Sequence, residues 1–173
     1  DDALDAMFRE LAPVVSLAKE IDRCILSEEE IADDASNGLR SVRRAMKTAA
    51  EKIRTQLNSL VVNSRTYLQD GVITMRNGRY CVPVKAEHKS NVPGMVHDQS
   101  SSGSTIFVEP LSVVKLNNEL RELEIREQKE IEAVLAALSN QTCDHLDELT
   151  LDLELIGELD FIFAKATLSR HCL

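Results

Sequence analysis

Aromatic residues are scarce in this sequence. Phe and Tyr together make up 3% of the 173 residues, and Trp is absent. Apolar residues of all kinds still account for 43% of the chain, so its core must be built from Leu, Ile, Val and Ala. A core of this composition favours helices packed against helices over a ligand pocket lined by aromatic rings.

A long apolar run is also missing. No stretch approaches the roughly eighteen unbroken apolar residues that a transmembrane helix needs, so no membrane partner is expected. The chain begins at Asp1 rather than Met, and no basic-then-apolar leader precedes the first helical pattern. We therefore expect an internal segment of a longer cytoplasmic protein.

Clustered cysteines are absent. The chain has four cysteines without a Cys-x-x-Cys pair: Cys24, Cys81, Cys143 and Cys172. Zinc would require thiolates or imidazoles close together in the sequence, so no metal site is expected. Reduced structural thiols are predicted instead, which agrees with a reducing compartment.

Charge of one sign dominates the whole chain but not its parts. The formal net charge of −9 argues against nucleic-acid binding by the chain as a whole. The formal charge alternates, however: −8 over residues 1–38, +6 over 39–65, +1 over 66–108, −10 over 109–160 and +2 over 161–173. Such alternation predicts basic and acidic helices that pair with each other.

Helical periodicity dominates the first part of the chain. Residues 3–26 carry apolar residues at three- and four-residue spacing, and Pro13 is expected to bend or split this helix. Ser27 and Glu30 have the spacing of a capping box, which predicts a short helix there.

A second, longer helix is predicted after Ser36, its expected N-cap. A heptad-like apolar series runs from Leu39 to Leu60, and neither Pro nor Gly interrupts residues 39–70. One helix on the order of 40 Å long is therefore expected.

The periodicity changes to alternation between residues 71 and 109. Two short strands flank Asn77 and Gly78, a pair typical of a type I′ hairpin turn. Pro83 predicts an edge strand or a bulge, because proline has no N–H to donate. A second hairpin is expected around Gly103, which gives a four-stranded antiparallel sheet.

Helical periodicity returns after Pro110. A heptad-like stripe of leucines extends over residues 110–140, and Glu is frequent at the other positions. A break in the helix is expected near Ser139 and Asn140. The last segment, residues 143–168, is apolar on two sides and is therefore predicted to be buried on two sides.

The expected fold is mainly α with a small antiparallel β insert. A helical core bundle would carry two long antiparallel helical arms with the sheet at their ends. The predicted parts are 1–38 and 141–173 for the two halves of the core, 39–70 and 110–140 for the arms, and 71–109 for the sheet.

Residues 77–120 carry a specific family likeness. NGRYCVPVKAEHKSNVPGMVHDQSSSGSTIFVEPLSVVKLNNEL resembles the second bacterial MutS paralogue family, whose members usually end in a Smr domain. GELDFIFAKA at residues 157–166 is similar to the family's AELDFIFAKA pattern. The resemblance extends over essentially the whole chain. It implies that the arms are lever helices and that the sheet is a clamp.

The resemblance also implies a function for the longer protein. It would be a cytoplasmic, homodimeric MutS-like ATPase, with or without Smr nuclease activity. Its partners would be branched or mismatched DNA, in suppression of homologous recombination, or collided ribosomes, in their rescue. The resemblance implies ATP and Mg in an ATPase domain outside this chain, and no Gly-x-x-x-x-Gly-Lys-Ser/Thr loop occurs in the chain itself. The segment itself is expected to be non-catalytic and without a cofactor.

Candidate nucleic-acid contacts lie on the clamp. Between residues 71 and 97 the sequence has one acidic residue, Glu87, and four basic ones: Arg76, Arg79, Lys85 and Lys89. As phosphate contacts they would weaken with added salt; otherwise they are a solvated sheet face or protect a sheet edge. Secondary candidates on the first arm are expected mainly to pair with the acidic arm: Arg43, Arg44, Lys47 and Arg54.

Other polar residues allow competing interpretations. His97 and Asp98 are adjacent in a strand and should point to opposite faces, which argues against a hydrolase triad with the nearby serines. Glu109 could mark the entry to the helix, while Asn117 and Asn118 could bond to the base of the sheet. The alternative function is a purely structural coiled-coil spacer or dimerisation element without nucleic-acid contact.

Overall fold

The computed structural model describes residues 3–171, and the chain divides into two compact units. Unit 1 consists of Asp1–Ala35 and Glu132–Leu173, and unit 2 is Ser36–Ile131. Within residues 3–171, no helix combines the length and apolarity that crossing a bilayer requires. The predicted fold class is confirmed: long helices predominate, and the β structure is a four-stranded antiparallel sheet and a separate two-stranded one.

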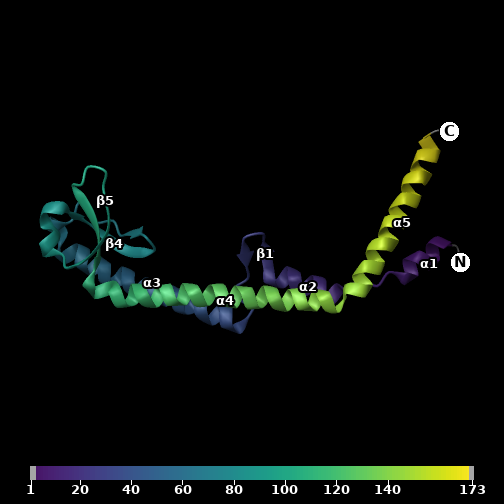
Figure 1. The fold of residues 1–173 in the computed structure, drawn as a ribbon, viewed down its shortest axis with the longest axis horizontal. Helices are drawn as coiled ribbons and strands as arrows, with labels where there is room; N and C mark the ends of the chain where they lie inside the picture. The colour runs from purple at the N-terminus through teal and green to yellow at the C-terminus, as the bar shows by residue number, and fades with distance from the viewer. Residues whose placement is uncertain (1–2, 172–173) are drawn as a thin grey trace. The chain divides into compact units, whose positions relative to one another are not determined.

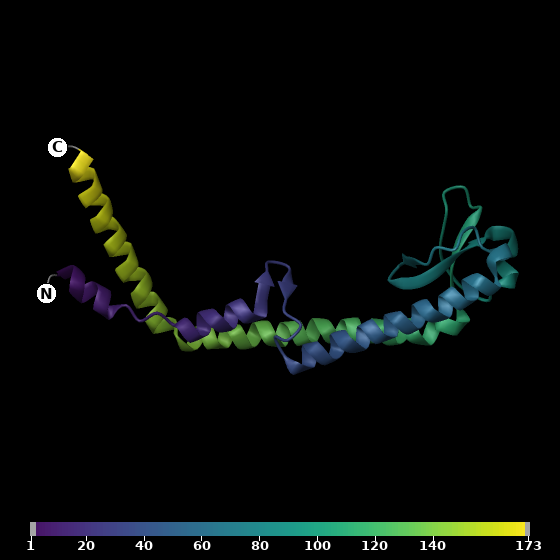
Figure 2. The same cartoon turned by 180° about the vertical axis from the view of Figure 1, so that it is seen from behind.

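Two long helices form the stem of unit 2. α3 (Asn37–Asn63) runs beside the first part of α4 (Val114–Asp144), as both Figure 1 and Figure 2 show. The predicted N-cap of α3 is confirmed, since Ser36 Oγ accepts a hydrogen bond of 2.9 Å from the backbone N–H of Leu39. Leu57 of α3 and Leu120 of α4 belong to one apolar core that continues under the sheet.

The sheet of unit 2 consists of β3 (Thr74–Arg76), β4 (Arg79–Lys85), β5 (Gly94–Gln99) and β6 (Thr105–Pro110). All neighbours are antiparallel, in the order β3-β4-β6-β5. The Asn77–Gly78 turn adopts the positive φ angles, 52° and 73°, that a type I′ turn demands. Val82 and Val108 pair across β4 and β6 and are fully buried in the core.

α3 ends earlier than its sequence predicted. The helix stops at Asn63 rather than continuing to residue 70, and η1 (Arg65–Tyr67) follows it. Leu68 then forms a bridge with Val84, because burying Leu68 against the sheet requires the chain to leave the helix. The expectation of an edge strand or a bulge at Pro83 is wrong, since β4 lies between β3 and β6 and its register with β6 is regular there. The missing N–H is tolerated because the pairing with β3 ends at Cys81, and the Pro83 carbonyl accepts from the Gln69 N–H.

The second helix also differs from its predicted limits. β6 continues to Pro110, η3 (Leu111–Val113) follows, and α4 then begins at Val114. The break expected near Ser139 and Asn140 is absent, since α4 runs on to Asp144. Between β4 and β5 lies η2 (Ala86–Asn91).

Unit 1 begins with two helices on either side of Pro13, α1 (Ala3–Glu10) and α2 (Val15–Cys24), as the proline predicted. The prediction of a short helix that begins at Ser27 is wrong. β1 (Ile25–Ser27) and β2 (Glu30–Ile31) form a hairpin there instead. Ser27 Oγ accepts from the Glu29 N–H at 3.3 Å, which is a turn contact rather than a capping box. Ile25 and Ile31 pack on the cluster of Cys24, Val134 and Leu138, which favours the hairpin.

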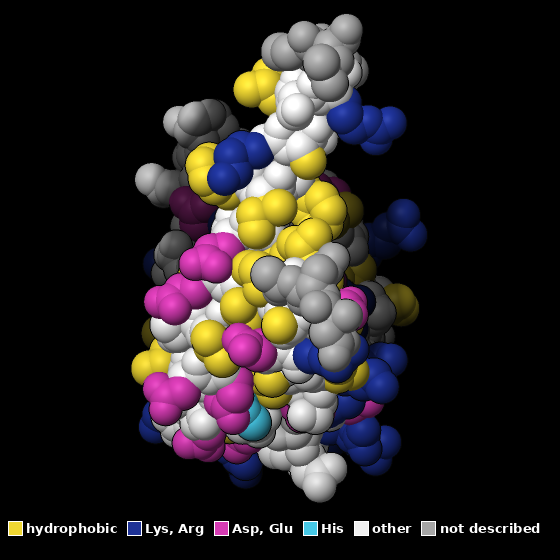
Figure 3. Space-filling model, turned by 90° about the vertical axis from the view of Figure 1, so that its right-hand side faces the viewer, with side chains coloured by type: hydrophobic (Ala, Val, Ile, Leu, Met, Phe, Trp, Pro, Cys, Tyr) yellow, Lys and Arg dark blue, Asp and Glu magenta, His cyan; other side chains and the backbone are white. Residues whose placement is uncertain are grey.

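The last helix, α5 (Leu146–His171), is not buried on two sides, so that prediction is wrong. Leu155 and Leu159 are buried, but Leu153 is 73% exposed and Phe161 is 62% exposed. Unit 1 supplies neighbours for one stripe of the helix only. A groove of about 550 Å³ opens beside it, lined mainly by apolar residues of α2 and α5. On the face that Figure 3 shows, hydrophobic side chains gather next to acidic ones.

Candidate nucleic-acid interface

A buried carboxylate organises the polar side of the sheet. Glu109 at the end of β6 is fully buried, and three side chains from other elements reach its oxygens. Arg79 of β4 lies 3.1 Å from Oε1, and His97 of β5 lies 2.5 Å from Oε2. Asn117 of α4 donates to Oε1 at 2.8 Å. A buried carboxylate is strongly destabilising unless it is paired, so these contacts fix the strands to one another.

Asn117 fastens the sheet to α4. Its side-chain oxygen accepts from the Tyr80 N–H at 3.1 Å, and its Nδ2 lies 3.2 Å from the Tyr80 carbonyl. Asn117 is 1% exposed. Its two bonds to the Tyr80 backbone take the place of a neighbouring strand at that residue. The expectation that an asparagine of this helix bonds to the sheet is confirmed for Asn117, whereas Asn118 is exposed.

The four clamp cations predicted from sequence do not have equivalent surroundings. Arg79 is held by Glu109 and is only 26% exposed in its side chain, so it serves the fold. Arg76 Nε lies 3.2 Å from Asp98 Oδ2 without the alignment of a hydrogen bond, and the guanidinium stacks 4.0 Å from the Phe107 ring centre. Arg76 and Arg79 thus each lie beside an acidic side chain, Asp98 and Glu109 respectively, which the sequence did not predict.

The other two clamp cations are more accessible. Lys85 Nζ donates to the Thr66 carbonyl at 3.2 Å and is partly exposed. Lys89 in η2 is exposed and forms no ion pair among residues 3–171. These two side chains, on consecutive elements, keep charge available to a partner.

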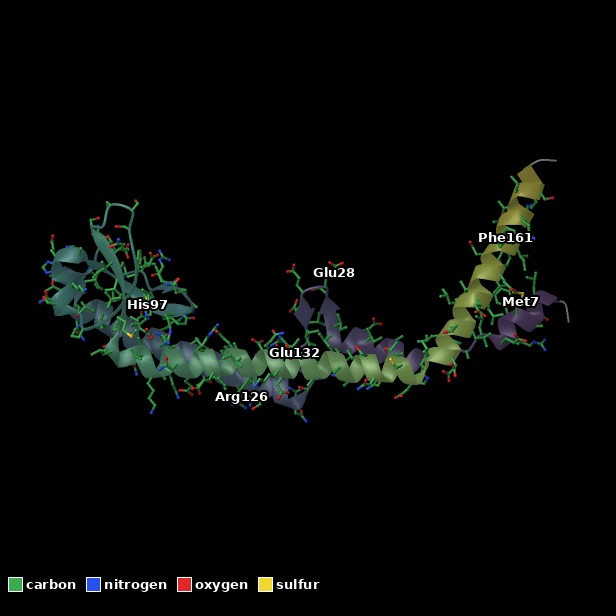
Figure 4. All side chains as sticks on the ribbon, in the orientation of Figure 1. Met7, Glu28, His97, Arg126, Glu132 and Phe161 are labelled. Carbon is green, nitrogen blue, oxygen red and sulfur yellow. The ribbon has the colours of Figure 1, made fainter. Side chains whose placement is uncertain are left out.

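His97 and Asp98 do not form a catalytic pair with each other. A bulge in β5 shifts the register between Val96 and Asp98, and His97 bonds to Glu109 while Asp98 lies beside Arg76. The sequence predicted that the two side chains point to opposite faces of a regular strand, and it did not predict the bulge. Figure 4 labels His97 among the strands of unit 2. The nearby serines bond to one another and to the backbone of their own loop.

The secondary candidates on α3 differ in their surroundings. Arg43 faces α4 and pairs with Glu127, with 2.7 Å between Nε and Oε1, as predicted for pairing between the arms. Arg54 lies 6.0 Å from the ring centre of Tyr80. Arg44 and Lys47 are exposed, and neither forms an ion pair with any described residue.

Thiols and possible metal ligands are spread apart. Burial raises the pKa of the Cys81 thiol to about 11, with the Glu109 charge acting in the same direction. Burial also raises the pKa of Cys24. Cys143 is exposed, and Cys172 lies outside the described residues. Among residues 3–171, no three His, Cys, Asp or Glu side chains gather in a way that could hold a metal ion.

Comparison with known proteins gives long matches. The chain is 58% identical over 171 residues to Endonuclease MutS2 of Agathobacter rectalis, which covers 98% of this chain and 22% of that protein. It is 56% identical over 173 residues to Endonuclease MutS2 of Lachnospira eligens, with 99% and 22% covered. Over the segment that it spans, this chain belongs to the MutS2 family. The resemblance carried by residues 77–120 is thereby confirmed.

The match concerns one part of a longer protein. Endonuclease MutS2 of Clostridium novyi is 46% identical over 165 residues, 95% of this chain and 21% of that protein. The chain thus spans about a fifth of the length of these curated MutS2 relatives. No protein-family model matches the chain.

Proposed function

We propose that this chain is the non-catalytic core, lever and clamp segment of a MutS-like ATPase, and that its unit 2 contacts nucleic acid. The observation that supports this contact is the division of charge. Ser36–Ile131 has 15 Lys and Arg against 10 Asp and Glu, a formal charge of +5. The rest of the chain has 5 against 19, or −14. A polyanion would be attracted to unit 2 and repelled by unit 1.

On the sheet, Lys85 and Lys89 are proposed as the direct phosphate contacts. Arg76 contributes charge next to Asp98, while Arg79 is assigned to stability because Glu109 holds it. This division determines which of the four cations a binding test can reverse. Reversing all four charges would place a second carboxylate beside the buried Glu109 and destabilise the sheet.

The full-length protein is proposed to be a cytoplasmic homodimer that binds ATP and Mg in a domain beyond these residues. The relatives carry the name endonuclease, which supports a nucleic acid as substrate of the whole protein. Branched or mismatched DNA and the RNA of a collided ribosome share the phosphate backbone as the group to be recognised. A test with both kinds of nucleic acid separates them.

The experiment is fluorescence anisotropy of the 173-residue chain with labelled duplex DNA, four-way-junction DNA and duplex RNA at 50 and 200 mM KCl. Binding should weaken steeply with salt, because phosphate contacts release counterions. Lys85→Glu with Lys89→Glu should weaken binding more than Lys165→Glu with Arg170→Glu. The second pair changes the net charge equally but lies on α5 of unit 1.

A chain that binds none of the three nucleic acids at 50 mM KCl would contradict the proposal. The structural alternative, a spacer or dimerisation element, would then stand. Stronger binding to the junction than to the duplex would favour branched DNA as the partner. Preference for RNA would favour the ribosome.

A further inference from the structure

We infer that the outward face of α3 is a docking surface for the sugar–phosphate backbone of a nucleic-acid double helix. This inference rests on the proposed contact of unit 2 with nucleic acid, but it names a surface separate from the sheet. The surface is formed by Arg44, Lys47 and Arg54, and we call it the α3 basic face.

Helical geometry places these three side chains together. Their spacing of three and seven residues keeps them on one side of α3. The opposite side carries Val42, Ala49 and Ile53, which are buried in the core of unit 2. All three side chains of the α3 basic face are exposed. The face is therefore fixed in orientation by the core behind it.

The acidic neighbours on α4 do not neutralise this face. Glu127 pairs with Arg43 at the seam, where both side chains are only 23% exposed. Glu130 lies 3.4 Å from Ser36 Oγ, at the beginning of α3. Because Arg43 and Arg44 are adjacent in the helix, their side chains diverge by about 100°. Pairing at the seam therefore leaves Arg44 directed away from α4. Lys47 and Arg54 lie about 40° and about 20° from Arg43 around the helix, so they form the edge of the face that is nearer to α4.

The chemistry of the face fits a backbone rather than bases. α3 itself contains no Phe, Tyr or Trp, and the one ring near the face, that of Tyr80, packs against the core of unit 2 and lies 6.0 Å from Arg54. Stacking of an unpaired base is therefore not favoured there. Arg44 and Arg54 lie about 15 Å apart along the helix axis, a span that covers several phosphates of one strand. Cations on a rigid helix position a duplex without reading its sequence. Binding through this face should therefore be independent of base sequence.

One acid stands on the same face and provides an internal check. Glu51 is exposed and lies between Lys47 and Arg54 on the outward side of α3. A carboxylate in this position repels phosphate. Removing its charge should therefore strengthen binding if the duplex lies along this face, and should change nothing if it does not.

The test compares charge changes on the two helices of unit 2 in the 173-residue chain. Arg44→Glu with Lys47→Glu is the test variant. Arg126→Glu with Lys129→Glu is the matched control, because both residues are exposed on α4 (Arg126 is labelled in Figure 4). Circular dichroism melting checks that each variant stays folded. Anisotropy with random-sequence 20-bp DNA and RNA duplexes measures affinity against salt.

The test variant should bind both duplexes about tenfold or more weakly, with a salt slope lowered by about 2. Glu51→Lys should bind more tightly than the unchanged chain. Equal loss in the α4 control, or a test variant that binds as the unchanged chain does, would overturn the inference. Binding that is lost only through Lys85 and Lys89 would do the same and leave the proposed function intact. Absence of binding by the unchanged chain would remove both.

Discussion

At the scale of single residues, the most consequential side chains are the polar ones that the core encloses. The sequence singled out Asn117 because an asparagine inside a helix competes for backbone bonds, and the structure gives it Tyr80 and Glu109 as partners. The sequence could not show that Arg79 is one of the partners of Glu109. That pairing depends on the register of β4 against β6, which sequence alternation leaves open.

Replacing Asn117 by Ala should destabilise unit 2 by about 2–4 kcal/mol, because the Tyr80 backbone and the Glu109 carboxylate lose a buried partner. Asn118→Ala is the matched control and should change stability by less than about 0.5 kcal/mol, since Asn118 is exposed. Urea unfolding followed by tyrosine fluorescence measures both, as Tyr67 and Tyr80 lie in unit 2 and are the two tyrosines of the chain. Equal effects of the two variants would refute the role of Asn117.

At the scale of elements, the sequence predicted beginnings better than ends. Ser36 identified the start of α3, and Asn77 with Gly78 identified the β3–β4 turn, because caps and turns are local chemistry. The end of α3 depends on Leu68 reaching Val84, a contact across the fold. The β1–β2 hairpin depends likewise on the Val134 and Leu138 cluster. Two-sided burial of α5 was wrong because apolar periodicity does not say whether a neighbour is present.

The two helices of unit 2 should be held by apolar packing, with ion pairs adding little. Leu57→Ala should cost about 2–5 kcal/mol, since Leu57 is fully buried. A double-mutant cycle on Arg43 and Glu127 should give a coupling of about 0.2–1 kcal/mol, because both side chains are partly exposed to solvent. Urea unfolding of the four variants gives these values. A coupling larger than the loss at Leu57 would reverse this ranking.

At the scale of the whole chain, the charge pattern was the most informative sequence feature. In the structure the five blocks of charge are distributed over a basic unit and an acidic unit, and the acidic block 109–160 is divided between the two. The candidate site was predicted less well, since charge counts found the basic region but could not tell structural cations such as Arg79 from accessible ones such as Lys89. Burial and pairing decide that difference, and both follow from tertiary contacts.

In unit 2 the sheet lies between α3 and α4 in the chain, and this arrangement has a consequence for the order in which the unit folds. β3 and β4 meet across a two-residue turn, whereas Arg43 and Glu127 are 84 residues apart in the chain. Closing that long loop costs less entropy once the sheet has shortened it. Valine-to-alanine changes at Val82 and Val108 should therefore slow refolding and give high φ-values. A change at Val42 should mainly speed unfolding. Stopped-flow tyrosine fluorescence would measure these rates, and a φ-value at Val42 above that at Val82 would show that the stem forms before the sheet.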